Sequence, residues 1–352
     1  MYTRSQTRAL KIGPLPLGGG APVSVQTMAT ADPHDAAALA AQVRRCAEAG
    51  ADLVRLTVPD VEAARVFGVV RRASPVPLVA DIHFDYRCAL AAIEAGADAL
   101  RLNPGNIGGR VRVQAVARAA QARHVPIRVG VNGGSLEREL LVKYGTATAE
   151  ALVESALAHV ALLEAEGMRD IAISVKASDV ARTLAAYRLL AERTDCPLHL
   201  GVTEAGTFLP GTVRSSVALG ILLEEGLGDT IRVSLTDAPE REVKVGLEIL
   251  RALGLRAPGP SVTSCPTCGR TKVDVVGVGA SGPYRCGARE EAAPRGRDGV
   301  RRERSRRGEG GRCRVVRRRA RISALRGRAA RREGAARGRR GGGPVGCARF
   351  DV

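Results

Sequence analysis

Short apolar runs rich in β-branched residues recur along the chain, and each is followed by a longer segment whose apolar residues have helical spacing. This alternation is typical of βα units that surround a parallel sheet. Eight such runs predict strands at residues 23–28, 52–58, 77–84, 99–104, 126–132, 170–177, 197–204 and 230–235. Because eight βα units of this total length match a single TIM barrel, we predict an α/β protein with a (β/α)8 barrel over residues 1–256.

The alternating pattern stops at the Pro- and Gly-rich segment 257–260. We expect a linker there, and a small second domain that begins within residues 257–278. Beyond residue 279 the chain is rich in Arg, Gly and Ala and has no hydrophobic period. Such a segment cannot bury enough apolar surface to offset its ordering entropy, so residues 279–352 are expected to form a disordered tail.

The net charge of +18 is concentrated in this tail. Residues 279–352 contain 23 Arg and 7 acidic residues, which leaves 31 basic and 29 acidic residues in the rest of the chain. A nucleic-acid-binding protein that uses the basic tail is therefore an alternative hypothesis, but it is not favoured, since the part that is expected to fold is nearly neutral. With no long apolar run and no signal-like start, we expect a cytoplasmic protein with no membrane association.

Five predicted strands each carry one cation inside an apolar run. These cations are Arg55, Arg101, Arg128, Lys176 and Arg232. Burying a guanidinium is costly unless an anion meets it, and the carboxyl ends of barrel strands converge on the mouth where TIM-barrel active sites lie. We therefore predict a substrate with several phosphate charges. The alternative is that the arginines form internal ion pairs with Asp81, Asp85 or Glu204.

Polar residues near the same strand ends are candidates for orienting the ligand. They are Asp81, His83, Asn103, Asn132, Ser135, His199, Thr203 and Glu204. Among the histidines, His83 and His199 have the most weight, because both are predicted at strand ends that face the mouth.

Cysteine spacing adds a candidate metal site. Of the eight cysteines, only Cys265 and Cys268 have ligand spacing, in the sequence Cys-Pro-Thr-Cys. Two thiolates three residues apart suit either zinc or an iron-sulfur cluster. Zinc would need a second pair at matching spacing, which the later cysteines do not supply. A barrel enzyme of phosphosugar or pterin chemistry with structural zinc remains an alternative.

Seven motifs in order carry a resemblance to the bacterial 4-hydroxy-3-methylbut-2-enyl diphosphate synthase family, and the similarity covers residues 8–278. The motifs are Val-Gln-Thr-Met28, Pro77-Leu-Val-Ala-Asp-Ile-His-Phe-Asp-Tyr86, Leu102-Asn-Pro-Gly-Asn-Ile-Gly108, Arg128-Val-Gly-Val-Asn-Gly-Gly-Ser-Leu136, Ser174-Val-Lys-Ala-Ser-Asp179, Leu198-His-Leu-Gly-Val-Thr-Glu-Ala-Gly206 and Cys265-Pro-Thr-Cys-Gly-Arg270.

The resemblance implies a reductive opening of 2-C-methyl-D-erythritol 2,4-cyclodiphosphate in isoprenoid biosynthesis. It implies a homodimer and a 4Fe-4S cluster held by three cysteines and a glutamate, which receives electrons from flavodoxin or ferredoxin. The five cations would clamp the diphosphate, and Cys265 and Cys268 would be cluster ligands. Asp81 and His83 would be the catalytic pair. Further substrate contacts would come from Asn103, Asn132, His199 and Ser234.

One family segment, Gly-Cys-Val-Val-Asn-Gly-Pro-Gly-Glu, which supplies the third cysteine and the glutamate, does not occur in the chain. Synonymous codons for residues 295–309, read one base later, translate as Val-Ala-Val-Met-Gly-Cys-Val-Val-Asn-Gly-Pro-Gly-Glu-Ala. Because this translation contains the missing segment, we predict that residues 279–352 are the product of a frameshift near Val278.

Overall fold

The computed structural model describes residues 4–103, 105–257, 261–263 and 312–314. The chain divides into two compact units, residues 1–256 and 257–352. In the second unit, strand β11 (Ser261–Thr263) pairs in parallel with β12 (Arg312–Arg314). Most of segment 257–278, in which the small second domain is predicted to begin, lies outside the described residues, and this includes Cys265 and Cys268. Most of the predicted tail 279–352 lies outside them as well.

The first unit is the predicted eight-stranded parallel barrel, which the structure confirms. Its strands are β3 (Ser24–Met28), β4 (Leu53–Thr57), β5 (Leu78–Asp81), β6 (Ala99–Leu102), β7 (Ile127–Asn132), β8 (Ile171–Lys176), β9 (His199–Leu200) and β10 (Thr230–Ile231). They pair in the order β8-β7-β6-β5-β4-β3-β10-β9. A bridge between Ile173 and Leu198 brings the two edges of this sheet together. Strands β9 and β10 are shorter than predicted.

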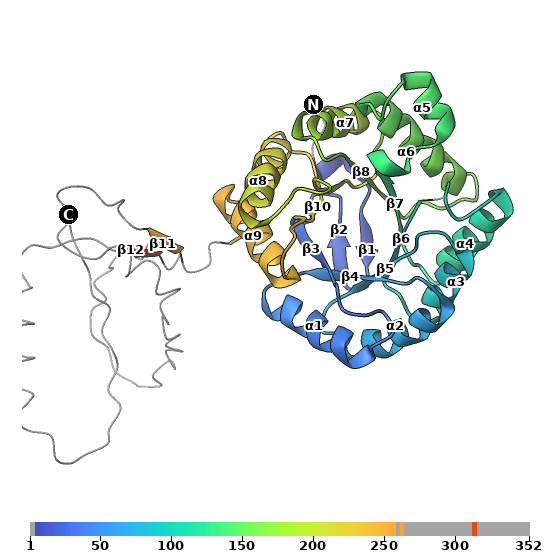
Figure 1. Ribbon diagram of the computed structural model, residues 1–352, viewed down its shortest axis with the longest axis horizontal. Helices are drawn as coiled ribbons and strands as arrows, with labels where there is room; N and C mark the ends of the chain where they lie inside the picture. Colours follow the sequence, from blue (N-terminus) through green and yellow to red (C-terminus); the bar gives the residue numbers. More distant parts are fainter. Residues whose placement is uncertain (1–3, 104, 258–260, 264–311, 315–352) are drawn as a thin grey trace, which may run out of the picture. The chain divides into compact units, whose positions relative to one another are not determined.

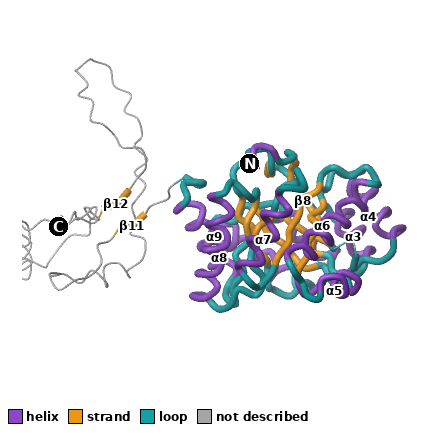
Figure 2. Tube along the Cα trace, turned by 90° about the horizontal axis from the view of Figure 1, so that it is seen from above, coloured by secondary structure: helices purple, strands orange, loops and turns teal. Residues whose placement is uncertain are grey.

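Helices surround the strands as an outer ring, which Figure 1 shows from one end of the barrel and Figure 2 from its side. They are α1 (Ala36–Glu48), α2 (Val61–Ala73), α3 (Tyr86–Glu94), α4 (Arg110–Ala122), α5 (Arg138–Tyr144), α6 (Ala149–Glu164), α7 (Val180–Ala191), α8 (Phe208–Glu224) and α9 (Pro239–Ala252). Two single 3-10 turns are η1 (Arg4–Gln6) and η2 (Gly133–Ser135). Among the described residues, no helix is long and apolar enough to cross a membrane.

Aspartates fix where several helices begin. Asp35, Asp60, Asp85 and Asp179 are the N-cap residues of α1, α2, α3 and α7, and each side chain accepts a hydrogen bond from a backbone N–H of the first turn. Such caps satisfy N–H groups that have no partner inside the helix. Because each cap follows a strand closely, it also fixes the length of the loop at the carboxyl end of that strand.

A second set of aspartates fixes the strand register at the opposite end. Asp52, Asp98 and Asp229 each precede a strand. Each accepts a hydrogen bond of 2.8 Å from a backbone N–H near the start of the adjacent strand in the sheet. The first two follow glycines with positive φ, Gly50 and Gly96, which end the preceding helices. This explains the recurring Gly-Ala-Asp sequence, since only glycine adopts that backbone without strain.

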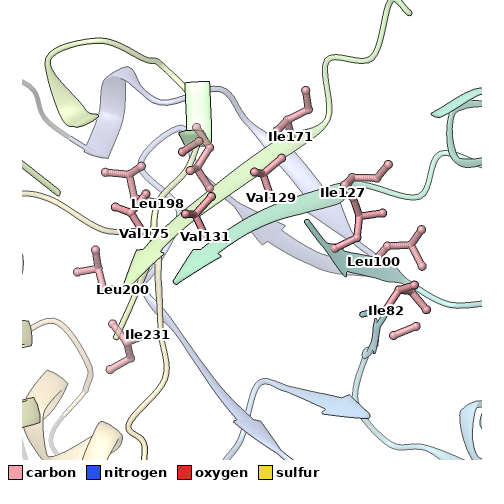
Figure 3. Close-up of a cluster of buried hydrophobic side chains, with 14 of the residues drawn as sticks. Ile82, Leu100, Ile127, Val129, Val131, Ile171, Val175, Leu198, Leu200 and Ile231 are labelled. Carbon is pink, nitrogen blue, oxygen red and sulfur yellow. The ribbon is translucent and has the colours of Figure 1, made fainter. Parts of the chain in front are cut away.

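Most of the hydrophobic core lies between the strands and the helices. Residues at alternate strand positions point outward into it, and Figure 3 labels ten of these buried side chains on and around strands β5 to β10. Val129 and Val131 of β7 and Val175 of β8 are completely buried there. Successive strand residues point to opposite faces. On each strand, the residues next to these valines must therefore face the barrel interior.

An N-terminal hairpin closes one end of the barrel interior. Strand β1 (Leu10–Ile12) pairs antiparallel with β2 (Leu15–Leu17), and Figure 1 shows both in the middle of the ring of strands. Apolar side chains of this hairpin, which we call the plug, pack against inward-facing residues at the start of four barrel strands. The cluster comprises Leu10, Ile12, Leu17, Leu53, Val79, Ala99 and Ala172. The plug is not among the elements predicted from the sequence.

Candidate active site at the barrel mouth

The inner face of the barrel changes from apolar to polar along four of its strands, β4, β5, β6 and β8. Two residues after the apolar layer under the plug, β4 continues to Arg55, β5 to Asp81, β6 to Arg101 and β8 to Ser174. Because inward-facing positions recur every second residue, these side chains all point into the barrel interior near the carboxyl ends of the strands.

Asp81 is the central anion of this group. Its carboxylate is buried and lies 3.4 Å from Arg55 Nε and 3.3 Å from Arg101 Nη1. Burial alone would raise the pKa of Asp81, but the nearby charges of Arg55 and Arg101 lower it below its usual value. Asp81 is therefore a carboxylate, and it compensates part of the charge of two guanidinium groups. His83 Nε2 lies 3.9 Å from the same carboxylate, at the half-exposed rim.

Arg232 has its own carboxylate partner, Glu242, which the sequence analysis missed. Arg232 Nη2 donates to Glu242 Oε1 at 3.0 Å, and Nε donates to Oε2 at 3.2 Å. Glu242 is only 3% exposed and also accepts hydrogen bonds from Thr27 Oγ1 and from the Leu235 backbone N–H. The sequence does carry a signal for this ion pair. Glu242 falls on the apolar side of amphipathic α9, and a buried glutamate requires a partner.

The remaining two cations have no carboxylate partner within 4 Å in the described part of the chain. Arg128 donates from Nη1 to Ser174 Oγ and from Nη2 to Gln26 Oε1, both at 3.2 Å. Lys176 is 7% exposed. Burial, reinforced by the neighbouring cations, holds the pKa values of both groups well below their usual range. An anion placed between them would reverse this penalty.

The cations converge on one cavity of about 140 Å³, which we call the mouth cavity. It is lined by Met28, Arg55, Asp81, His83, Arg101, Arg128, Asn132, Ser174, Lys176, Val202, Thr203 and Arg232. All five predicted cations are among these residues. The internal ion pairs considered as an alternative exist for Arg55 and Arg101 through Asp81, whereas Arg128 and Lys176 form none with described residues.

The other candidates, which lie outside this lining, are Asn103, Ser135, His199, Glu204 and Ser234. Asn103 is buried, and its Oδ1 accepts a hydrogen bond from Gly105 N at 3.0 Å, so it shapes the loop after β6. Ser234 Oγ accepts from Arg232 Nη1 at 2.9 Å. His199 differs from the expectation of a strand-end residue, because β9 begins with it and pairs it with Thr230, the first residue of β10.

His199 therefore lies below the mouth, at a second cavity of about 20 Å³ that Arg128 also lines. Its ring is fully buried, and neither ring nitrogen has a hydrogen-bond partner among the described residues. Burial and the surrounding cations hold the pKa of His199 well below 6.5, so the imidazole is neutral.

The described residues do not provide a ligand set for an iron-sulfur cluster. Within them, no group of three His, Cys, Asp or Glu side chains could hold a metal ion. Cys46, Cys88 and Cys196 are buried as free thiols at separate places, and burial raises the pKa of Cys46 to about 12. A protonated thiol is a poor metal ligand.

A closed TIM barrel whose mouth holds more buried cations than carboxylates defines a class: a barrel protein that binds a phosphorylated ligand at the carboxyl ends of its strands. Comparison with known proteins then specifies the family. The model of the GcpE TIM-barrel domain matches residues 7–247. The chain belongs to the 4-hydroxy-3-methylbut-2-en-1-yl diphosphate synthase family, as its motifs indicated.

Relatives with this name are similar over most of their length. The chain is 57% identical over 275 residues to 4-hydroxy-3-methylbut-2-en-1-yl diphosphate synthase (flavodoxin) of Geobacter sulfurreducens, which covers 78% of each chain. It is 58% identical over 276 residues to the protein of the same name from Maridesulfovibrio salexigens, covering 78% of this chain and 77% of the relative. A solved 3-dehydroquinate dehydratase from Geobacillus kaustophilus, 14% identical with a TM-score of 0.50, covers 72% of this chain and 99% of its own, and shares the fold alone.

Proposed function

We propose that the mouth cavity binds 2-C-methyl-D-erythritol 2,4-cyclodiphosphate for its reductive conversion to 4-hydroxy-3-methylbut-2-enyl diphosphate. The names of the relatives, which specify this product and flavodoxin, support the reaction. The observation that carries the proposal is the pair Arg128 and Lys176, which are buried at the cavity without a described carboxylate partner. A diphosphate would supply the missing negative charge.

The reaction breaks the ring carbon-oxygen bond at a phosphate and expels one hydroxyl, with two electrons from reduced flavodoxin. The phosphate oxygen released from the ring keeps a negative charge, so Arg128 and Lys176 would stabilise the product side of the step. The departing hydroxyl needs a proton to leave as water. His83, at the rim of the mouth cavity and 3.9 Å from Asp81, is the proposed donor of this proton, and Asp81 would orient it.

The iron-sulfur part of the proposal rests on the sequence beyond the barrel. We propose that Cys265 and Cys268 are cluster ligands and that the missing cysteine and glutamate lie in the shifted reading frame of codons 295–309. Resequencing the coding DNA across codons 270–352 tests this. An intact frame with codons incompatible with the shifted translation would contradict it. In that case the Arg-rich segment would require a function of its own.

The family resemblance also leads us to propose a homodimer. Light scattering of the full chain over a range of concentrations tests this directly. A constant molar mass of one chain, 36.9 kDa, would contradict it.

Binding of the cyclic diphosphate to the full chain tests the site separately from the cluster. Calorimetric titration of Arg128→Gln and Lys176→Gln should give dissociation constants more than tenfold above wild type, because a charge-assisted phosphate contact contributes roughly 1.5–3 kcal/mol. Arg44→Gln is the control, since Arg44 is exposed on the outer helix α1. Unchanged affinity in both cavity variants would refute the proposed phosphate site.

A further inference from the structure

We propose that the absence of a side chain at Gly130 positions Arg101 on the barrel wall and thereby sets the size of ligand that the mouth cavity accepts. This inference rests on the proposed function, because it concerns the same cavity. Gly130 lies in the middle of β7, on the inward-facing side between Arg128 and Asn132. It is the one position of these three that contributes no side chain to the site.

The space beside Gly130 is occupied by the head group of Arg101. A Cβ atom at Gly130 would overlap Arg101 Nε and would lie 3.0 Å from Nη2 and 3.1 Å from Cζ. The guanidinium is held in this place from two sides. Nη2 donates a hydrogen bond of 3.1 Å to the Gly130 carbonyl oxygen, and Nη1 donates to Asp81 Oδ1 at 3.3 Å. The cation therefore lies against the backbone of β7 instead of projecting across the cavity.

Backbone conformation does not explain this glycine. Gly130 is absent from the glycines with positive φ, and it pairs with Ser174 in a regular parallel ladder. Any residue could adopt this extended backbone, and glycine weakens a strand because it loses more entropy and contributes no packing. The close approach of Arg101 is therefore the physical reason for a glycine at this position.

Gly201, which directly follows β9, shows a similar arrangement. A Cβ atom there would lie 3.0 Å from Lys176 Nζ and 3.1 Å from Cε. It would also lie 2.7 Å from the Arg232 carbonyl oxygen, which belongs to the backbone and cannot move away easily. Two of the five cations thus rest against glycine backbone, and substitution of Gly201 would disturb the fold as well as the site.

Gly130 is the better position to test, because its three nearest contacts all belong to the flexible end of one side chain. In Gly130→Ala the barrel can keep its fold while the Arg101 head group moves into a cavity of only about 140 Å³. The movement breaks the hydrogen bond to the Gly130 carbonyl and reduces the space for a ligand with two phosphates. A small anion such as inorganic phosphate needs less of this space.

The experiment measures binding of the cyclic diphosphate and of inorganic phosphate to the full chain. We expect Gly130→Ala to weaken diphosphate binding at least tenfold and phosphate binding less than threefold. Gly220→Ala is the matched control, since no heavy atom outside its own helix lies within 4 Å of a Cβ placed there. Equal loss for both ligands, or no loss for either, would overturn the size argument.

A double-mutant cycle separates positioning from a general structural effect. In an Arg101→Ala background the clash is absent, so Gly130→Ala should change diphosphate affinity less than twofold and should not lower the urea unfolding midpoint. A similar loss with and without Arg101 would show that Gly130 does not act through that arginine. If the wild-type chain fails to bind the cyclic diphosphate, the proposed function falls, and the unfolding midpoints still decide whether Gly130 and Arg101 are coupled.

Discussion

The two ends of the barrel interior use the same strands for opposite purposes. At the plugged end, inward-facing Leu53, Val79 and Ala99 pack against the hairpin and exclude water. Two residues farther along the same strands, the interior holds Arg55, Asp81 and Arg101. The strand period makes this change possible over a distance of only about 7 Å. Stability is therefore concentrated at one end, which allows the other end to hold charges that burial disfavours.

The largest expected effect of breaking this division is at the plugged end. Leu53→Ala should lower the free energy of unfolding by about 2–5 kcal/mol, because Leu53 is fully buried and the shortened side chain leaves a cavity under the plug. Affinity for the cyclic diphosphate should stay within twofold of wild type wherever the protein is folded. Urea unfolding and calorimetry measure the two quantities. A stability loss accompanied by an equal loss of affinity would mean that the two ends are not independent.

How much of this difference between the two ends can be predicted from the sequence depends on how far apart in the chain the contacting residues are. The strands and their five cations were predictable, because a period of two and a charge inside an apolar run are local signals. The plug was not predictable, since Leu10 packs in one cluster with Ala172, which lies 162 residues farther along the chain. The partner of Arg232 was missed because Glu242 lies on a helix, and the depth of His199 because β9 begins later than its apolar run.

A smaller effect with the opposite sign is expected at the mouth. Lys176→Met should raise the free energy of unfolding of the unliganded protein by about 1–2 kcal/mol, since it removes a buried cation that has no described carboxylate partner. The same variant should lose at least about half of the stabilisation by ligand, which in wild type is about 2.7 kcal/mol at a hundredfold excess over the dissociation constant.

Thermal unfolding with and without the cyclic diphosphate measures both effects, the gain in stability without ligand and the loss of stabilisation by ligand. Lys143→Met provides a control, because Lys143 is exposed and forms its ion pair with Glu154 on the outer helices. A Lys176→Met protein that is less stable than wild type without ligand would show that this cation is compensated within the unliganded chain, contrary to the cost assigned to it.

The pH dependence of stability tests the boundary between the two ends, where His199 lies. Its pKa is lowered in the folded protein, so below about 6.5 the unfolded chain binds a proton that the buried imidazole does not. Stability should fall by up to about 1.4 kcal/mol for each pH unit below 6.5, until the folded pKa is reached. His199→Gln should reduce this slope. A smaller slope should remain because of His159, whose pKa burial also lowers. An unchanged slope between pH 5 and 6.5 would mean that His199 takes up its proton in the folded state.

The smallest effect concerns the attachment of the plug. Thr7 Oγ1 lies 3.0 Å from Asp229 Oδ1 and also accepts a hydrogen bond from the Gly19 backbone N–H. Thr7→Val keeps the shape of the side chain and removes these bonds, so it should lower the free energy of unfolding by about 1 kcal/mol. Thr146→Val is a suitable comparison, because the same change is made far from the plug, in the loop between α5 and α6.

Since the plug is the far boundary of the interior, diphosphate affinity should not change in Thr7→Val. Hydrogen exchange of residues 10–17 should quicken while that of β7 stays constant, because a loosened plug opens locally without disturbing the strands above it. Faster exchange in both segments would show that the plug and the mouth open together, and that the barrel does not keep its two ends separate.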